Sequence, residues 1–190
     1  MLHSAFRRII QHIDFIISKS PSIKSNPVGI FFYDELSFYR PENIIHRKRL
    51  INNYRKPLKA EKLVLLEADY KTKPYNRREI YTKIRIEKPL NEKYHIAFYI
   101  PFLGVIPEEL TETYPLSQHE LPRPQDITGK VNELSAEVII DYVVKHGYIE
   151  VLIEKPKYYQ ELIHELIRRL KERNIKFSIV DASTLEKRLD

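Results

Sequence analysis

The chain has no cysteine among its 190 residues. This absence excludes disulfide bonds, thiolate metal sites and a cysteine nucleophile. There are only four glycines, and Gly104 and Gly129 are isolated, so the sequence has no glycine-rich loop of the kind that binds phosphate. None of the seven histidines is paired with another at metal-ligand spacing beside an acid. We therefore expect neither a metal nor another cofactor.

The sequence also lacks a long hydrophobic run. The most apolar stretch near the N-terminus, residues 9–17, is interrupted by Gln11, His12 and Asp14 and is far shorter than the ~20 residues of a membrane-spanning helix. It also has no small-residue cleavage site of a signal peptide. With 43% hydrophobic residues, the chain can still bury an ordinary core. These features predict a cytoplasmic protein with no membrane association.

Charge is abundant and unevenly distributed. Charged residues make up 31% of the chain, which together with few glycines and one methionine resembles the composition of thermophile proteins. The formal net charge is +6, yet residues 40–88 alone contain fifteen Lys or Arg against six Asp or Glu. The candidate cations in this segment are Arg47, Lys48, Arg49, Arg55, Lys73, Arg77 and Arg78.

Tyrosines are interleaved with these cations, among them Tyr54, Tyr70, Tyr75 and Tyr81. Clustered cations among aromatic rings suit the phosphate backbone and the unstacked bases of a nucleic acid. The segment therefore predicts nucleic-acid binding. The alternative is a solvated helix face followed by a soluble loop.

Hydrophobic periodicity and turn residues predict alternating helices and strands. The expected helices are residues 4–18, 41–54, 77–83, 132–146 and 158–173, with a further short helix inside 104–115 that has Pro107 in its first turn. The expected strands are residues 28–33, 62–66, 95–100, 148–153 and 176–180. Residues 18–27 and 121–129 are expected to be loops. This alternation predicts an α/β fold of three layers, a mainly parallel central sheet with helices on both faces.

Two parts of the chain are expected to differ in organisation. Residues 1–37 are predicted to form an amphipathic helix and a linker, and residues 38–190 an α/β domain. In the helix expected at 41–54, Ile44, Ile45, Leu50 and Ile51 are predicted to point inward and the arginines and lysines outward. Functional loops of such folds follow the carboxyl ends of the strands, which is where the segment after the strand 62–66 lies.

Five short motifs occur in a characteristic order. They are Arg40-Pro41-Glu42, Arg49 with Tyr54-Arg55-Lys56-Pro57, a strand that leads to Lys73-Pro74-Tyr75, Gly104 to Leu110, and Tyr114-Pro115. Together they resemble the catalytic domain of archaeosine synthase and its short relatives, over about residues 38–182. The resemblance implies a role with tRNA, because archaeosine synthase joins lysine to the nitrile of a 7-cyano-7-deazaguanine base in archaeal tRNA.

The loop that resembles the family's reactive loop has lost its polar signature residues. The family pattern places a Pro-Cys pair where this chain has Ala68 and Asp69, and a Ser and a His where it has Arg78 and Tyr81. A thiolate can add to a nitrile carbon, whereas a carboxylate is a much weaker nucleophile, and tyrosine does not carry protons at neutral pH as histidine does. We therefore expect this chain to lack the family's own reaction and to have no catalytic residue of that kind.

The domain also resembles uracil-DNA glycosylases in architecture, and the triplet Lys73-Pro74-Tyr75 occupies the place of one of their motifs. Their first motif ends in Asp-Pro-Tyr, so the aspartate that activates water is replaced here by Lys73. The His-Pro-Ser loop of those enzymes has no counterpart, and base excision is not expected. Tyr75 is predicted either to stack on an extruded base or to pack as a structural plug under the loop.

Further candidate site residues are suggested only by their position in the sequence. Asp69, Tyr114, Gln118 and His119 lie where the resemblance implies a pocket, although surface or packing roles are the alternative. The acids Glu108, Glu109 and Glu112 could serve as acid and base, or simply favour the start of a helix.

These observations lead to one functional hypothesis and one alternative. The hypothesis is a non-catalytic or accessory tRNA-binding protein in archaeal tRNA modification, with tRNA as a partner and another protein of the archaeosine pathway as a candidate partner. The alternative is a divergent transferase that uses Lys73 or Asp69 in a changed reaction on a 7-deazaguanine base.

Overall fold

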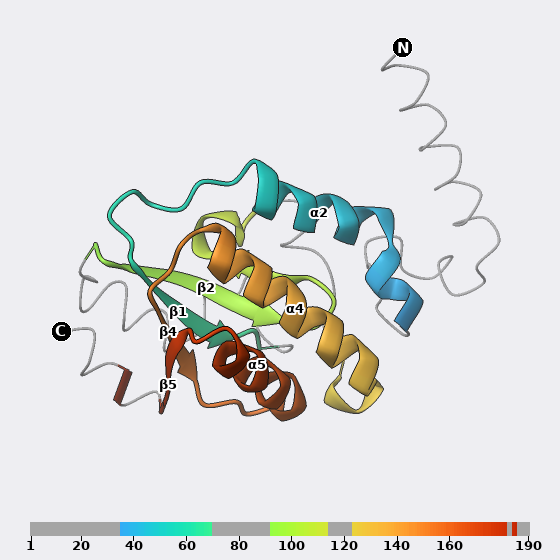
Figure 1. Ribbon diagram of the computed structural model, residues 1–190. Helices are drawn as coiled ribbons and strands as arrows, with labels where there is room; N and C mark the ends of the chain where they lie inside the picture. The colour runs from blue at the N-terminus through green and yellow to red at the C-terminus, as the bar shows by residue number, and fades with distance from the viewer. Residues whose placement is uncertain (1–34, 70–91, 114–122, 182–183, 186–190) are drawn as a thin grey trace, which may run out of the picture. The chain divides into compact units, whose positions relative to one another are not determined.

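The computed structural model describes residues 35–69, 92–113, 123–181 and 184–185 (Figure 1). All of them belong to the compact unit formed by residues 31–190. The elements, in chain order, are the 3-10 helix η2 (Glu35–Tyr39), α2 (Pro41–Asn52), β1 (Lys62–Glu67), β2 (Tyr94–Ile100), β3 (Gly104–Pro107), the 3-10 helices η5 (Glu108–Leu110) and η6 (Pro124–Asp126), α4 (Gly129–Lys145), β4 (Glu150–Glu154), α5 (Gln160–Glu172) and β5 (Lys176–Val180).

The five strands form one sheet in the order β3-β2-β1-β4-β5. β1 is central and pairs in parallel with β2 and with β4, and β4 pairs in parallel with β5. Only β3, at one edge, runs antiparallel to its neighbour β2. A central parallel strand is buried on both faces, which explains why β1 is an uninterrupted apolar run from Leu63 to Leu66. The predicted α/β fold with a mainly parallel sheet is confirmed.

The two faces of the sheet are packed differently. Leu63, Leu65 and Ile153 face a cluster that contains buried residues of α2, α4 and α5. Val64, Leu66 and Leu152 belong to a second cluster, which among the described residues includes none from these helices. Figure 1 shows α4 and α5 in front of the sheet and α2 above them. The helix expected at 77–83 lies outside the described residues, so helices on the opposite face stay a prediction.

The helices α4 and α5 follow from familiar local signals. The hydroxyl of Thr128 accepts a hydrogen bond from the N–H of Val131 and caps α4, while Gly147, at φ 63°, follows its C-terminus. α5 buries Leu162, Ile163, Leu166 and Leu170 at helical spacing.

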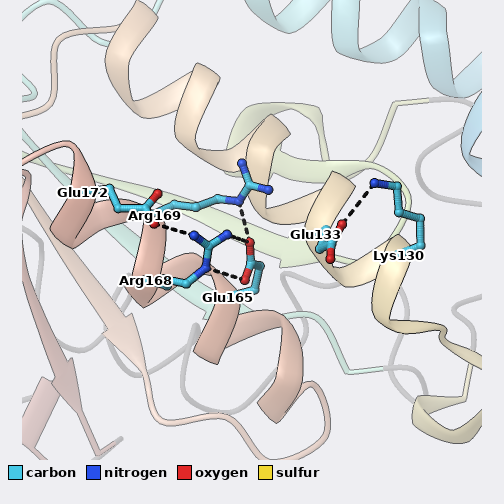
Figure 2. Close-up of polar contacts among 6 residues, drawn as sticks. All are labelled: Lys130, Glu133, Glu165, Arg168, Arg169 and Glu172. Carbon is cyan, nitrogen blue, oxygen red and sulfur yellow. Dashed lines mark hydrogen bonds and ion pairs between the residues drawn. The ribbon is translucent and has the colours of Figure 1, made fainter.

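The outer side of these helices carries ion pairs. Figure 2 shows Glu165 of α5 paired with Arg168 and Arg169, Arg168 paired in turn with Glu172, and Lys130 of α4 paired with Glu133. Exposed pairs of this kind contribute about 0–1 kcal/mol each, whereas burying one leucine side chain contributes about 1.5–3 kcal/mol. Packing therefore holds α5 in place, and its charges keep the outer face hydrated.

The short helix predicted inside 104–115, with Pro107 in its first turn, is present only as the single turn η5, and the strand β3 formed by Gly104–Pro107 was not predicted. A tight turn after β2 returns the chain antiparallel, with Phe102 at φ 69° and Gly104 at φ 84°. A Cβ atom at Gly104 would lie 2.4 Å from Cγ1 of Val138, so only glycine fits between β3 and α4. Pro107 ends β3 at the sheet edge, where a missing N–H is tolerated, and only the single turn Glu108–Leu110 follows it.

The remaining predicted elements in the described residues are present, most of them with shifted ends. β5 matches its predicted range, β1 ends one residue later, β2 begins one residue earlier, and β4 is displaced from 148–153 to 150–154. α2 ends two residues early, α4 begins three residues early, and α5 is shorter at both ends than the predicted 158–173. The expected loop 121–129 contains η6 and the first residue of α4. The elements expected at 4–18 and 28–33 lie outside the described residues.

The inward face of α2 was predicted only in part. Leu50 is buried and Ile51 packs against the core, as expected, but two polar residues take the other inward positions. The buried residues of α2 are Asn43, His46 and Leu50, whereas Ile45 is 47% exposed. The side-chain amide of Asn43 donates to the carbonyl of Ser37, and Nε2 of His46 is 2.9 Å from the carbonyl oxygen of Val105. Because these polar side chains satisfy backbone groups, they are buried in place of isoleucines.

Within the described part of the chain, no helix has the length and apolar character needed to cross a lipid bilayer.

The burial of His46 predicts a specific pH dependence of stability. Burial lowers the pKa of His46 from 6.5 to about 4, against the opposing effect of its hydrogen bond to Val105. The unfolded chain therefore binds a proton at this residue below about pH 6.5, while the folded protein does not until about pH 4. The contribution of His46 to the free energy of unfolding is fully present above pH 6.5. It falls by up to about 3 kcal/mol as the pH drops to 4.

We expect His46→Gln, which retains an N–H donor but does not titrate, to show a weaker loss of stability between pH 6.5 and 4 than the wild type. Urea denaturation at several pH values measures this difference. His164→Gln, an exposed position in α5, is the matched control and should behave as the wild type. Equal pH slopes for His46→Gln and the wild type would contradict the assignment.

Candidate functional site at the carboxyl edge of the sheet

The order of the strands places a switch in topology between β1 and β4. From β1 the chain continues to β2 on one side, and from β4 it continues to β5 on the other side. In open parallel sheets, ligands bind outside the carboxyl ends of the strands at such a switch. β1 ends at Glu67 and β4 at Glu154, so these two carboxylates lie at the expected position.

Glu67 fixes the loop between β4 and α5. Its carboxylate accepts three consecutive backbone N–H groups, from Lys157 at 2.8 Å, Tyr158 at 2.9 Å and Tyr159 at 2.8 Å. Tyr159 is the N-cap residue of α5, so this negative charge lies at the positive end of a helix. Glu67 is only 2% exposed, and both of its oxygens are used in these bonds.

Glu154 forms the reciprocal connection. Its carboxylate accepts the backbone N–H of Glu67 at 2.7 Å and is buried beside it. The next residue, Lys155, donates its backbone N–H to the carbonyl of Val180 in β5 at 2.9 Å. The ends of β1, β4 and β5 are therefore tied together. We call Glu67 and Glu154 the edge carboxylates, and their contacts indicate a positioning role rather than proton transfer.

The turn after β2 lies at the same edge, and Arg47 braces it. Its guanidinium donates to the carbonyl of Phe102 at 2.9 Å and to the carbonyl of Phe38 at 2.7 Å, and lies 3.9 Å from the centroid of the Phe38 ring. The hydroxyl of Ser135 accepts the N–H of Phe102 at 3.0 Å. Burial lowers the pKa of Arg47 to about 10, which leaves it charged at neutral pH.

The predicted site residues are distributed over several places. Lys48 and Arg49 are exposed on α2, and Arg55, also exposed, donates to the backbone carbonyls of Asn52 and Tyr54. Asp69 is partly exposed two residues beyond the end of β1. The predicted site residues Lys73, Tyr75, Arg77, Arg78, Tyr114, Gln118 and His119 lie outside the described residues.

The sequence-based prediction missed the edge carboxylates. A signal was present, because each acid directly follows an apolar run that forms a buried strand, Leu63–Leu66 before Glu67 and Val151–Ile153 before Glu154. An acid at the carboxyl end of a parallel strand is a candidate for the edge of the sheet where ligands bind. What the pattern could not give is the partner of each acid.

The acid Glu109 belongs to a different place. It accepts a hydrogen bond from the hydroxyl of Tyr54 and lies 3.2 Å from Nε2 of His95, whose Nδ1 is 2.5 Å from the hydroxyl of Tyr148. His95 is the second residue of β2, so this network lies at the amino edge, opposite the switch. Burial by itself would raise the pKa of Glu109, but the hydrogen bond and charge of His95 lower it.

No group of three or more His, Asp or Glu side chains in the described segments is arranged to hold a metal ion.

The bonding of Glu67 makes a testable prediction about the carboxyl edge. Glu67→Gln replaces one acceptor oxygen by an amide N–H₂ that faces a backbone N–H, so at least one buried donor loses its partner. We expect a loss of about 1–3 kcal/mol, which corresponds to a melting temperature lower by roughly 3–10 °C. Differential scanning calorimetry measures the change.

The control is Glu172→Gln, at an exposed glutamate of α5 paired only with Arg168 among the described contacts. This variant should melt within about 1–2 °C of the wild type, since surface pairs contribute little. If both variants melt at the wild-type temperature, the Glu67 bonds do not stabilise the edge.

Comparison with known proteins identifies the family to which the chain belongs. A protein-family profile described as "Domain of unknown function (DUF5591)" matches residues 44–190. The "tRNA-guanine(15) transglycosylase" of Saccharolobus solfataricus is 30% identical over 144 residues, which cover 76% of this chain and 26% of that protein. The "Archaeosine synthase" of Haloferax volcanii is 24% identical over 157 residues, which cover 82% of this chain and 26% of that protein. The chain thus spans about a quarter of the length of these relatives.

Among solved structures, the "Crystal structure of AF0587, a protein of unknown function" superposes with a TM-score of 0.52 at 14% identity. The match covers 76% of this chain and 49% of that one. At this identity the likeness shows a shared fold.

Proposed function

Because the chain belongs to the DUF5591 family, which includes relatives of archaeosine synthase, we propose that it is a tRNA-binding protein that acts in tRNA modification without catalysing the family reaction. The observation on which this rests is that relatives named for modifying tRNA match about three quarters of this chain. We further propose a uracil-DNA-glycosylase-like architecture for the domain 38–190, and a role alongside another protein of the same pathway.

The absence of cysteine supports the non-catalytic part of the proposal. The resemblance implies a thiolate where this chain has Asp69, and there is no cysteine elsewhere to replace it. Asp69 follows the carboxyl end of β1, beside the edge carboxylates. A carboxylate at that place can bind or orient a ligand, but it adds poorly to a nitrile carbon.

Exposed cations on and after α2 support the RNA-binding part. Lys48, Arg49 and Arg55 are exposed, whereas Arg47 is committed to the carbonyls of Phe38 and Phe102. Replacing Arg47 would therefore disturb the fold as well as the charge, and it is a poor probe of RNA binding. The three exposed cations form the better test.

We expect the triple variant Lys48→Glu, Arg49→Glu and Arg55→Glu to bind an archaeal tRNA transcript more weakly, with little dependence on its sequence. The wild-type affinity should fall steeply with salt, because each neutralised phosphate adds roughly 0.7 to 0.9 to the logarithmic slope, and the variant should have a shallower slope. Gel-shift titrations at several salt concentrations measure both quantities.

The matched control changes the same charge at three exposed cations elsewhere, namely Lys130 of α4, Lys171 of α5 and Arg173 directly after α5, each replaced by Glu. A general effect of net charge would weaken both triple variants equally. Such a result, or a wild-type protein that does not retain tRNA at low salt, would contradict the proposed interface.

A divergent transferase is the second candidate, and the position of Asp69 beside the topological switch favours it. Incubation with lysine and tRNA that contains 7-cyano-7-deazaguanine separates the two candidates. We expect no lysine adduct in mass spectra of the digested nucleosides. An adduct formed by the wild type and lost in Asp69→Asn would instead establish the transferase.

A further inference from the structure

The loop between β4 and α5 presents a cation and an aromatic ring at the carboxyl edge of the sheet. We propose that Lys157 and Tyr158 bind one unstacked nucleotide of tRNA, with the base stacked on the Tyr158 ring and its phosphate paired with the Lys157 ammonium. This inference rests on the proposed tRNA binding, and it assigns to the RNA a contact that the basic segment 40–88 does not include.

The loop is held in a fixed conformation before any ligand arrives. The backbone N–H groups of Lys157, Tyr158 and Tyr159 all donate to the carboxylate of Glu67. A contact residue on a backbone held in this way loses little conformational freedom when it binds. Glu67 thus acts as a positioning residue, while the two side chains beyond it make the contact.

The charges around the loop are compatible with a polyanion. The carboxylates of Glu67 and Glu154 are turned toward backbone N–H groups and are 2% and 7% exposed. Asp181 lies 3.5 Å from the ammonium of Lys155, which offsets its charge. The exposed side chain of Lys157 therefore adds a cation to an edge where the carboxylates of Glu67, Glu154 and Asp181 are engaged.

Lys157 and Tyr158 already contact each other in a way that a nucleotide can replace. The ammonium nitrogen of Lys157 lies 5.0 Å from the centroid of the Tyr158 ring, and the ring packs partly against the core. An exposed cation–π contact is weaker than stacking of a base on an aromatic ring. A base can therefore displace the ammonium from the ring, and the flexible lysine can then reach the adjoining phosphate.

The same sheet supplies a matched control pair. The ammonium of Lys62 lies 5.3 Å from the centroid of the Tyr94 ring, and Tyr94 is also partly buried. Both residues begin strands, so this pair lies at the amino edge, opposite the switch. It repeats the cation–ring contact of the Lys157–Tyr158 pair at the opposite edge, although Lys62 is also paired with Glu150 at 2.9 Å, so the ring of Tyr94 is the matched element.

The test compares Tyr158→Ala, Tyr158→Phe, Lys157→Gln and Tyr94→Ala in gel shifts with an archaeal tRNA transcript. We expect Tyr158→Ala to weaken binding roughly 5- to 150-fold, which is the effect of removing one base-stacking ring. Tyr158→Phe, which keeps the ring, should bind as the wild type. Lys157→Gln should reduce the logarithmic salt slope by about 0.7, the value for one phosphate on a single strand. Tyr94→Ala should bind as the wild type.

The outcomes separate this inference from the function on which it rests. If the wild type does not bind tRNA, both are wrong. If the wild type binds but Tyr158→Ala and Lys157→Gln bind equally well, tRNA binding stands and the loop contact is wrong. Equal weakening by Tyr94→Ala also refutes the contact. Should Tyr158→Ala fail to fold, Lys157→Gln, at an exposed side chain, decides the question through the salt slope.

Discussion

The hydrogen bonds from three successive backbone N–H groups to the carboxylate of Glu67 are the constraint on which the carboxyl edge of this fold depends. They join the end of the central strand to the start of α5 across about ninety residues of sequence. Glu154 completes the connection by accepting the N–H of Glu67. Unpaired N–H groups before a helix are costly to bury, and a buried carboxylate is costly without donors, so each satisfies the requirement of the other.

The same principle applies to three further polar side chains that are buried or half-buried, Arg47, Ser135 and His46. Arg47 and Ser135 satisfy the carbonyl and N–H of Phe102, whose φ of 69° removes it from the regular pairing of β2 with β3. His46 bonds to the carbonyl of Val105 in β3, which attaches α2 to the edge strand. Arg47 belongs to a segment that looks like a surface charge cluster in the sequence, yet it and His46 stabilise the edge of the sheet through these contacts. The cations left for a ligand are those further along α2 and after it.

Polar residues that stabilise the fold are thus distinct from the exposed cations that we propose to bind RNA. This chain of the DUF5591 family has no cysteine, and its carboxyl edge is nevertheless fixed by hydrogen bonds. The edge carboxylates tie the carboxyl ends of β1 and β4 together. Asp69 follows the end of β1, and the β4–α5 loop follows the end of β4. The proposed binding of a nucleotide at this edge does not require a nucleophile, because binding depends on fixed geometry and complementary charge rather than on a reactive group.

The sequence by itself determined the α/β class, the parallel pairing and the approximate limits of β1, β2, β4, β5, α4 and α5, because apolar periodicity and capping residues act locally. It also indicated the family, through motifs whose order is a property of the chain. Tertiary structure alone decided that Gly104–Pro107 is a strand, because its pairing with β2 and the close approach of Val138 to Gly104 involve other segments. It likewise decided that Arg47 and His46 turn inward and that Glu67 holds the β4–α5 loop. A polar side chain bonds to whichever backbone groups the fold brings to it, and Val105, Phe102 and Tyr159 lie 59, 55 and 92 residues from His46, Arg47 and Glu67. Partners so distant in the sequence cannot be predicted from any local pattern.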